Sequence, residues 1–424
     1  IKVWERIGSE YSSMKEGKLA DLEKARIHEK ILQPKNAVVD YMRFSEKGKE
    51  KIHRTSLTNA AVILESVGEW NLAADAFLRL SVWIKSQKDK DAERDFAQAV
   101  EYSCRNRLFA SVKSTDKETF EKLSECSSFL AKRQAGMEGV LWRVRSAWAL
   151  EKTGKAADAL PLWQDIAAAR KLLTSREEYS IYLAMAKTRL LFPEFARYRA
   201  INFEKSNENP NANIARKAKA LEGLEASTVD IMKYGTPKQV ELARRALHAA
   251  YINFGETLEK SAFPKALAEV DKQALQKSFQ DAAKEMRQKA LEFVAAPKEK
   301  AERAEEKAEE DSSSYPDLDG KEFKELIVRA ANDPKDAESL ARLAWHMYEK
   351  GEFATARYVA TKWDGALKKG ASAGSKFDED AQKTFWKSIS KKIPMEDPVV
   401  VELNRDTEFN QQALTQWLYY WGPR

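Results

Sequence analysis

The chain has 424 residues, which is too long for one ordinary compact domain and long enough for a large buried core. Gly (16) and Pro (12) are scarce, which suits helices and argues against many tight β turns. The 72 Lys and Arg exceed the 66 Asp and Glu by a net charge of +6, so the composition indicates a mixed, solvated surface rather than a basic protein. No convincing run of alternating apolar and polar residues occurs, so the sequence predicts an all-α protein. It also contains no run of 18 apolar residues that could span a membrane.

The first part of the chain predicts a series of helices. Residues 1–53 are highly charged, and we expect two helices there with a break at Pro34. Residues 88–133 predict two more helices, with a break near residues 114–116. The sequence Ser-Thr-Asp-Lys-Glu at that break is typical of a helix start, because it combines a capping side chain with early acids.

A three-part pattern recurs and predicts helical hairpins. A large apolar residue is followed four residues later by Gly, and five residues after that by Ala. The spacing is typical of a helix, a tight turn and a second helix, and it predicts hairpins in residues 54–84, 137–171 and 320–364. The residues of the pattern are Leu64, Gly68 and Ala73, then Leu150, Gly154 and Ala159, then Met347, Gly351 and Ala356.

Further helices are expected between and after these hairpins. Residues 174–205 predict a pair divided at Pro193, and residues 212–259 predict a pair divided at 234–237, where Gly, Thr and Pro give stop and start signals. Residues 263–296 predict one or two long helices, and residues 376–390 another.

Composition changes sharply after residue 296. The next stretch is charged and Ala-rich and then polar, with no apolar face to bury, so we expect a helix extension and linker. The chain ends in a predicted helix, 406–421. The expected organisation is an N-terminal helical segment (1–53), a body of hairpins (54–296), a charged linker (297–319) and a separate C-terminal module (320–424).

Cys104 and Cys126 lie 22 residues apart, and we expect two thiols facing a core, with a disulfide as the alternative. The chain begins at Ile1 without Met. This start and the low Cys content favour an exported, periplasmic protein, with a cytoplasmic location and an excised segment left open.

The sequence predicts no catalytic, cofactor-binding or metal-binding residues. The four His residues lie far apart, so no local pair is available for a metal. No phosphate-cradling Gly-rich loop and no Gly-x-Ser-x-Gly motif occurs. The four His residues are His28, His53, His248 and His346.

The hairpin pattern resembles that of tetratricopeptide-repeat (TPR) proteins, whose repeat is two antiparallel helices with small contact residues and Gly at the turn. Residues 333–363 match best, with Asp333-Pro334 before the first helix and Phe353 after the turn. The turn glycines are not separated by whole repeats. The resemblance therefore implies an irregular TPR-like α-solenoid of antiparallel helical hairpins.

The resemblance also implies a concave groove lined by the first helix of each hairpin. It places Trp148 and Trp345 there, with Glu151 and Tyr348 one helical turn later, as candidate partner-binding residues. TPR domains that hold a carboxylate use Lys and Asn on these faces, and that clamp is absent. The corresponding residues are Thr55, Thr58 and Val62 in the first hairpin, and Leu141, Val144 and Trp148 in the second.

The last predicted helix carries Trp417, Tyr420 and Trp421 on one face, which we interpret as a solenoid cap or as a second contact site. The expected function is a non-enzymatic scaffold or adaptor that binds other proteins, without a cofactor, in a larger assembly such as one of the bacterial envelope. One alternative is a helical enzyme or binder acting on peptidoglycan or polysaccharide. The other is a nucleic-acid-binding repeat protein, which the unconcentrated charge does not favour.

Overall fold

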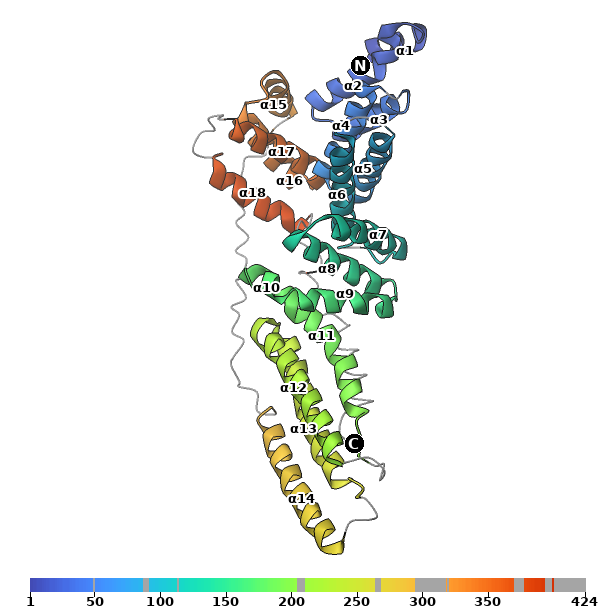
Figure 1. Cartoon of the computed structure of the whole chain (residues 1–424). Helices are drawn as coiled ribbons and strands as arrows, with labels where there is room; N and C mark the ends of the chain where they lie inside the picture. Colours follow the sequence, from blue (N-terminus) through green and yellow to red (C-terminus); the bar gives the residue numbers. More distant parts are fainter. Residues whose placement is uncertain are drawn as a thin grey trace. The chain divides into compact units, whose positions relative to one another are not determined.

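The computed structural model describes residues 1–48, 50–86, 91–112, 114–203, 210–263, 268–293, 318, 320–369, 377–392 and 399, and within them the chain is all-α. Consecutive helices pack against one another in pairs (Figure 1). None of the helices in these ranges is both long and apolar enough to cross a membrane. The helices are α1 (Lys2–Glu10), α2 (Lys15–Lys30), α3 (Pro34–Ser45), α4 (Lys51–Val67), α5 (Trp70–Lys85), α6 (Ala92–Ala110), α7 (Lys117–Arg133), α8 (Gly136–Lys152), α9 (Ala156–Ala168), α10 (Arg170–Leu173), α11 (Glu177–Arg199), α12 (Pro210–Tyr234), α13 (Pro237–Glu259), α14 (Glu269–Leu291), α15 (Gly320–Asn332), α16 (Ala337–Glu349), α17 (Phe353–Lys368) and α18 (Glu379–Lys392).

The three predicted hairpins are confirmed as α4–α5, α8–α9 and α16–α17, and their turns are built alike. Gly68, Gly154 and Gly351 have φ of 82°, 79° and 77°, a conformation that costs Gly little and other residues more. In each turn the backbone N–H after Gly donates to the carbonyl of the large apolar residue, at 3.0, 2.9 and 2.9 Å. The pattern's three Ala residues are fully buried, as expected of small residues at a helix–helix contact.

Two further helix starts follow the sequence signals. Asp116 accepts hydrogen bonds from the backbone N–H groups of Glu118 and Thr119 and so caps α7. Thr236 and Gln239 form a reciprocal capping box at the start of α13.

Two expectations about local structure are wrong. Pro193 lies inside the continuous helix α11 and does not divide it. Residues 1–53 contain α1, α2, α3 and the start of α4 rather than two helices, although Pro34 does begin a helix.

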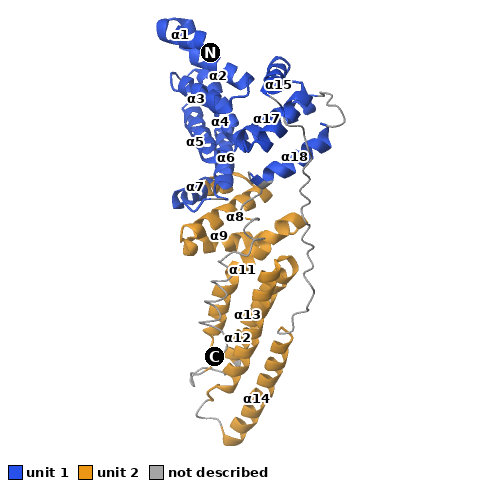
Figure 2. Cartoon of the chain, turned by 180° about the vertical axis from the view of Figure 1, so that it is seen from behind, with its two compact units in different colours: residues 1–126, 306–398 blue, residues 127–305, 399–424 orange. Residues whose placement is uncertain are grey.

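The chain forms two compact units, which Figure 2 colours separately. Unit 1 combines residues 1–126 with 306–398, and unit 2 combines residues 127–305 with 399–424. This division differs from the expected one, because residues 320–369 and 377–392 share a core with α2, α3 and α4 instead of forming a module of their own. The shared core includes Leu22, Tyr41, Phe44, Ile63, Leu340, Trp363 and Phe385.

Leu32 ends α2 in unit 1 with a left-handed backbone, φ 58°, where Gly is the usual residue. The next backbone N–H, of Gln33, donates to the carbonyl of His28 at 2.8 Å and completes the cap. Leu32 is only 5% exposed, so burial of its side chain offsets the cost of this conformation, about 1 kcal/mol.

Unit 2 has its own core between α11, α12, α13 and α14. The hydroxyl of Tyr198 on α11 donates to the carbonyl of Ala250 on α13 at 2.6 Å, which fixes these two helices. Helices α13 and α14 approach closely at Gly255, where a Cβ atom would lie 3.1 Å from the carbonyl oxygen of Ala283. A side chain at this position would push the two helices apart.

Cys104 on α6 and Cys126 on α7 form a disulfide, with Cα atoms 5.7 Å apart. The expectation of two free thiols is therefore wrong, and the alternative holds. The spacing of the two Cys residues in the sequence could not predict the disulfide, because its formation depends on how α7 packs against α6.

We expect reduction of this disulfide to lower the free energy of unfolding of the chain by about 3 kcal/mol, because the bond closes a long loop and restricts the unfolded chain. Urea unfolding with and without dithiothreitol measures the effect. The double variant Cys104→Ala, Cys126→Ala is the control and should be insensitive to the reductant. Equal stability of the oxidised and reduced wild type would contradict the assignment.

Candidate functional site

In unit 2, Trp148 and Glu151 belong to the interior of the α8–α9 hairpin. Trp148 is 2% exposed, and the ammonium of Lys152 lies 5.7 Å from the centre of its ring. Glu151 accepts a hydrogen bond from the indole N–H of Trp163 at 2.8 Å and pairs with Arg189 at 3.4 Å. Glu151 is therefore already occupied by side chains of its own unit.

In unit 1, Trp345 and Tyr348 lie on α16 and contact α18. Trp345 is 3% exposed, and its ring meets Phe385 edge-on, with centroids 5.0 Å apart. Tyr348 packs against the same phenyl ring, and burial raises its pKa. Helix α18 thus lies over the face of α16 that we expected to be open.

The four candidate groove residues are divided between the two units, with Trp148 and Glu151 in unit 2 and Trp345 and Tyr348 in unit 1. The two tryptophans are buried, whereas we expected them to face an open groove. Contact of these residues with a partner stays a prediction, and it would require the covering groups to move. Trp417, Tyr420 and Trp421 lie outside the described residues.

An open cavity does exist in unit 1, beside the first hairpin. Thr58 and Val62, two of the first-helix positions, line a cavity of about 590 Å³ between α4, α5, α6 and α17, which we call the α4–α6 pocket. Val62 is 52% exposed there. The remaining lining residues are Arg54, Glu65, Ser66, Phe77, Leu80, Ile84, Asp95, Gln98, Ala99, Tyr102, Arg357 and Thr361.

The charges around the α4–α6 pocket compensate one another. Arg54 donates to Asp95 at 2.8 Å, and this hydrogen bond lowers the pKa of the Asp95 carboxyl. Glu65 accepts from the side-chain amide of Asn106 at 3.4 Å. With equal numbers of cations and carboxylates above an aliphatic and aromatic floor, the pocket suits an uncharged apolar group.

Arg357 on α17 closes one side of the α4–α6 pocket. It is 4% exposed, and its Nη1 donates to the carbonyls of Glu65 and Ser66 at the end of α4. Its guanidinium lies over the Trp70 ring, 4.6 Å from the centroid, and burial lowers its pKa to about 10. Sequence reasoning missed Arg357, although a cation directly after the buried Ala of the pattern is a usable signal.

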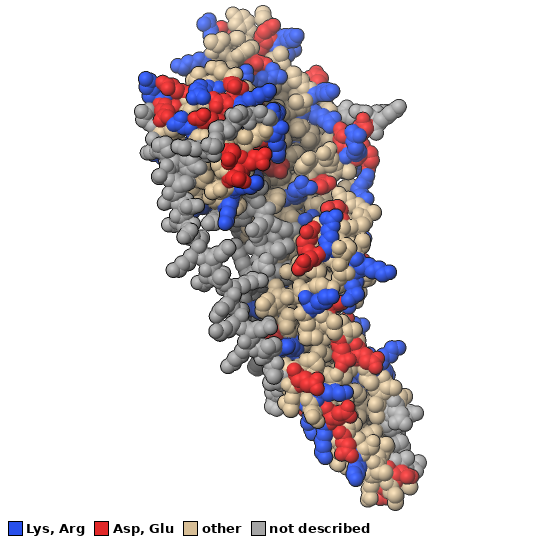
Figure 3. All heavy atoms as spheres, turned by 90° about the vertical axis from the view of Figure 1, so that its left-hand side faces the viewer, with Lys and Arg blue, Asp and Glu red and all other residues tan. Residues whose placement is uncertain are grey.

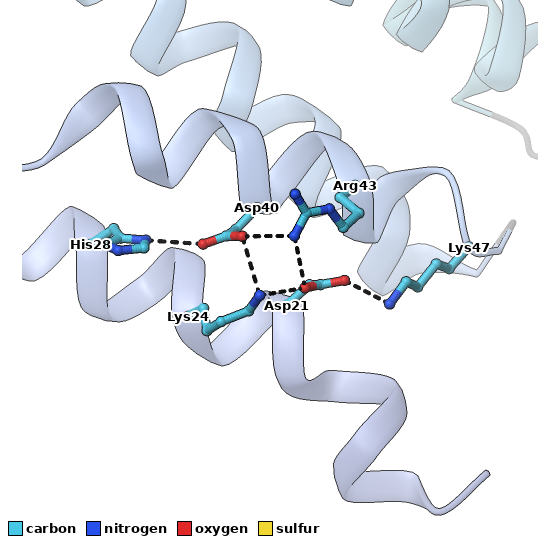
Figure 4. Close-up of polar contacts among 6 residues, drawn as sticks. All are labelled: Asp21, Lys24, His28, Asp40, Arg43 and Lys47. Carbon is cyan, nitrogen blue, oxygen red and sulfur yellow. Dashed lines mark hydrogen bonds and ion pairs between the residues drawn. The ribbon is translucent and has the colours of Figure 1, made fainter. Parts of the chain in front are cut away.

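A buried polar cluster joins α2 to α3 in unit 1 (Figure 4). Asp40 accepts from His28 at 2.9 Å and pairs with Lys24 at 3.5 Å, and Asp21 pairs with Lys24 at 2.8 Å. Burial opposes the charge on Asp21, but hydrogen bonds from Lys24 and Lys47 lower the pKa of its carboxyl. The contacts of Asp40 with His28 and Lys24 tie α3 to α2.

Lys217 is a second unusual buried group, and it lies in the core of unit 2. Its ammonium donates to the carbonyl of Ile201 at 2.7 Å, to Asn253 Oδ1 at 2.8 Å and to Thr257 Oγ1 at 3.0 Å. None of these acceptors is charged. Burial, with a smaller contribution from Arg199, lowers the pKa of Lys217 to about 8.

Because the pKa of Lys217 is lower in the folded chain than in the unfolded one, the unfolded chain binds more protons between pH 8 and 10. We therefore expect Lys217 to raise the free energy of unfolding by about 1 kcal/mol from pH 7 to pH 9. Urea unfolding at the two pH values measures this gain. The variant Lys217→Met should lack it. An equal gain in both proteins would contradict the burial of a charged ammonium at this site.

The described part of the chain contains no group of three or more His, Cys, Asp or Glu side chains placed to hold a metal ion. Searches against protein-family models, curated proteins and solved structures find no match for the chain. Any functional assignment therefore depends on the geometry described above.

Proposed function

We propose that the protein is a non-enzymatic interaction module, an irregular TPR-like stack of helical hairpins that holds a segment of a partner polypeptide. The α4–α6 pocket is the binding site in this proposal. The observation that carries it is the position of Thr58 and Val62. They occupy first-helix positions that the TPR resemblance assigns to the concave groove, and they line an open cavity.

The chemistry of the pocket favours an apolar peptide segment. Its volume of about 590 Å³ lies within the usual range of ligand sites. Phe77 and Tyr102 stack at 5.1 Å and form an aromatic floor beside Leu80 and Ile84. Because the surrounding charges are already paired, the pocket offers no group dedicated to a carboxylate, in agreement with the missing Lys and Asn clamp.

Neither alternative gains support from the geometry. In the α4–α6 pocket the hydrogen bond from Arg54 lowers the pKa of the Asp95 carboxyl, whereas the acid of a glycoside hydrolase needs a raised pKa. A nucleic-acid binder needs a strip of basic side chains. On the face drawn in Figure 3, Lys and Arg are interspersed with Asp and Glu.

The disulfide supports an exported protein. Disulfides persist in oxidising compartments such as the bacterial periplasm and are rare in the cytosol. We therefore propose that the chain works outside the cytoplasm, within an assembly of envelope or secreted proteins.

A photo-crosslinking experiment tests the pocket. We expect p-benzoylphenylalanine at position 62 to crosslink one polypeptide from an extract of the source cells, because this position opens into the pocket. An excess of unlabelled protein should compete for that polypeptide. An unlabelled competitor carrying Val62→Arg should compete at least about tenfold less well, because a long cation would enter an apolar pocket. Mass spectrometry identifies the crosslinked product.

Leu72 provides the matched control. It lies on α5, is 55% exposed against 52% for Val62, and does not line the pocket. Crosslinker at position 72 should capture nothing specific, and Leu72→Arg should compete as well as the wild type. Equal capture at the two positions would reject the pocket as the binding site.

A further inference from the structure

Unit 1 contains a second cleft, which the hairpin pattern did not indicate. It lies between the C-terminal half of α2 and the ends of α15, α16 and α17, with a volume of about 580 Å³, and we call it the α2–α17 cleft. Its lining residues are Glu23, Arg26, Ile27, Glu29, Lys30, Leu32, Ala330, Ala331, Pro334, Leu340, Lys362, Gly365, Ala366 and Lys369.

Small side chains give this cleft its depth. Ala330, Ala331, Gly365 and Ala366 leave space between the helices, and the cleft also has an aliphatic lining of Ile27, Leu32 and Leu340. A Cβ atom added at Gly365 would meet no heavy atom within 4 Å. The opening can therefore accept small or aliphatic side chains of another chain.

The charges around the α2–α17 cleft do not compensate one another. Both carboxylates are already bound. Glu23 accepts from Arg26 at 2.7 Å, and Glu29 accepts from Tyr41 at 2.9 Å and from Lys362 at 3.1 Å.

Two cations are left over. Lys30 and Lys369 have no ion-pair partner among the residues that the structure describes. They lie at the C-terminal ends of α2 and α17 respectively, so the cleft carries cations contributed by two different helices.

From this charge excess and the aliphatic lining we infer that the α2–α17 cleft binds an acidic polypeptide segment with small or aliphatic side chains. Its carboxylates pair with Lys30 and Lys369, and its apolar side chains enter beside Leu32 and Leu340. A concave site bordered by helix ends suits an inserted chain better than a flat lipid surface. This site is separate in its lining residues from the α4–α6 pocket.

Fluorescence anisotropy with the full chain tests the inference. The probe is a labelled amphipathic peptide of Ala, Leu and Glu, with a matched peptide in which Lys replaces each Glu. We expect the acidic peptide alone to bind, and more weakly as NaCl is added, because exposed charges are screened. The double variant Lys30→Glu, Lys369→Glu should raise its Kd by about tenfold or more.

Two further variants separate binding from folding. Lys18→Glu with Lys51→Glu makes the same change in net charge at exposed residues that do not line the cleft, and it should leave the Kd unchanged. Gly365→Leu fills the cleft with a better helix former, so it should abolish binding while the melting temperature stays the same or rises.

Three results would overturn the inference. The first is equal binding of the acidic and basic peptides. The second is binding that survives both Gly365→Leu and the Lys30, Lys369 reversal. The third is failure of the acidic peptide to bind while vesicles containing phosphatidylserine bind in a manner that depends on these two lysines, which would assign the cleft to a membrane surface.

Discussion

In unit 1, helix α17 packs against α4 of the first hairpin, although the two helices are far apart in the sequence. Arg357 forms the hydrogen bonds of this contact. The last carbonyls of a helix lack partners within the helix, and those of Glu65 and Ser66 accept from the buried guanidinium. A cation at this end also complements the helix dipole. Burial of the charge carries a cost, visible in the lowered pKa of Arg357, and the two carbonyls and the Trp70 ring offset it. Since Arg357 also lines the α4–α6 pocket, the same contact that joins α17 to α4 forms the wall of the proposed binding site.

Local chemistry could be predicted from the sequence because its causes lie within a few residues. The Gly turns and the helix starts near residue 116 and at Thr236 each need only a short stretch of chain. Pro193 shows the limit of such reasoning. A Pro usually interrupts a helix, but α11 continues through Pro193 without a break. The division into units could not be predicted, since it depends on contacts between residues separated by most of the chain.

Buried charge is handled in two different ways in the two units. Between α2 and α3 of unit 1, Asp21 and Asp40 are surrounded by cations that pair with their carboxylates. In the core of unit 2, Lys217 has neutral acceptors only, so its ammonium is solvated by the protein but not neutralised. The cations around Asp21 lower the pKa of its carboxyl, and burial lowers the pKa of the Lys217 amine. Neither Asp21, Asp40 nor Lys217 lines the α4–α6 pocket or the α2–α17 cleft.

The three hairpins share a turn but differ in the residue two positions before its large apolar residue. In the first hairpin that residue is Val62, and in the others it is Trp148 and Trp345. Both tryptophans are buried, whereas Val62 is exposed beside a cavity. A large aromatic ring at this position offers much apolar surface, so burying it stabilises a closed face. A smaller side chain such as that of Val62 offers less apolar surface and leaves space beside the helix. The burial of Trp148 and Trp345 thus explains why their own hairpins are closed at this position, and the smaller Val62 explains why the first hairpin borders an open cavity.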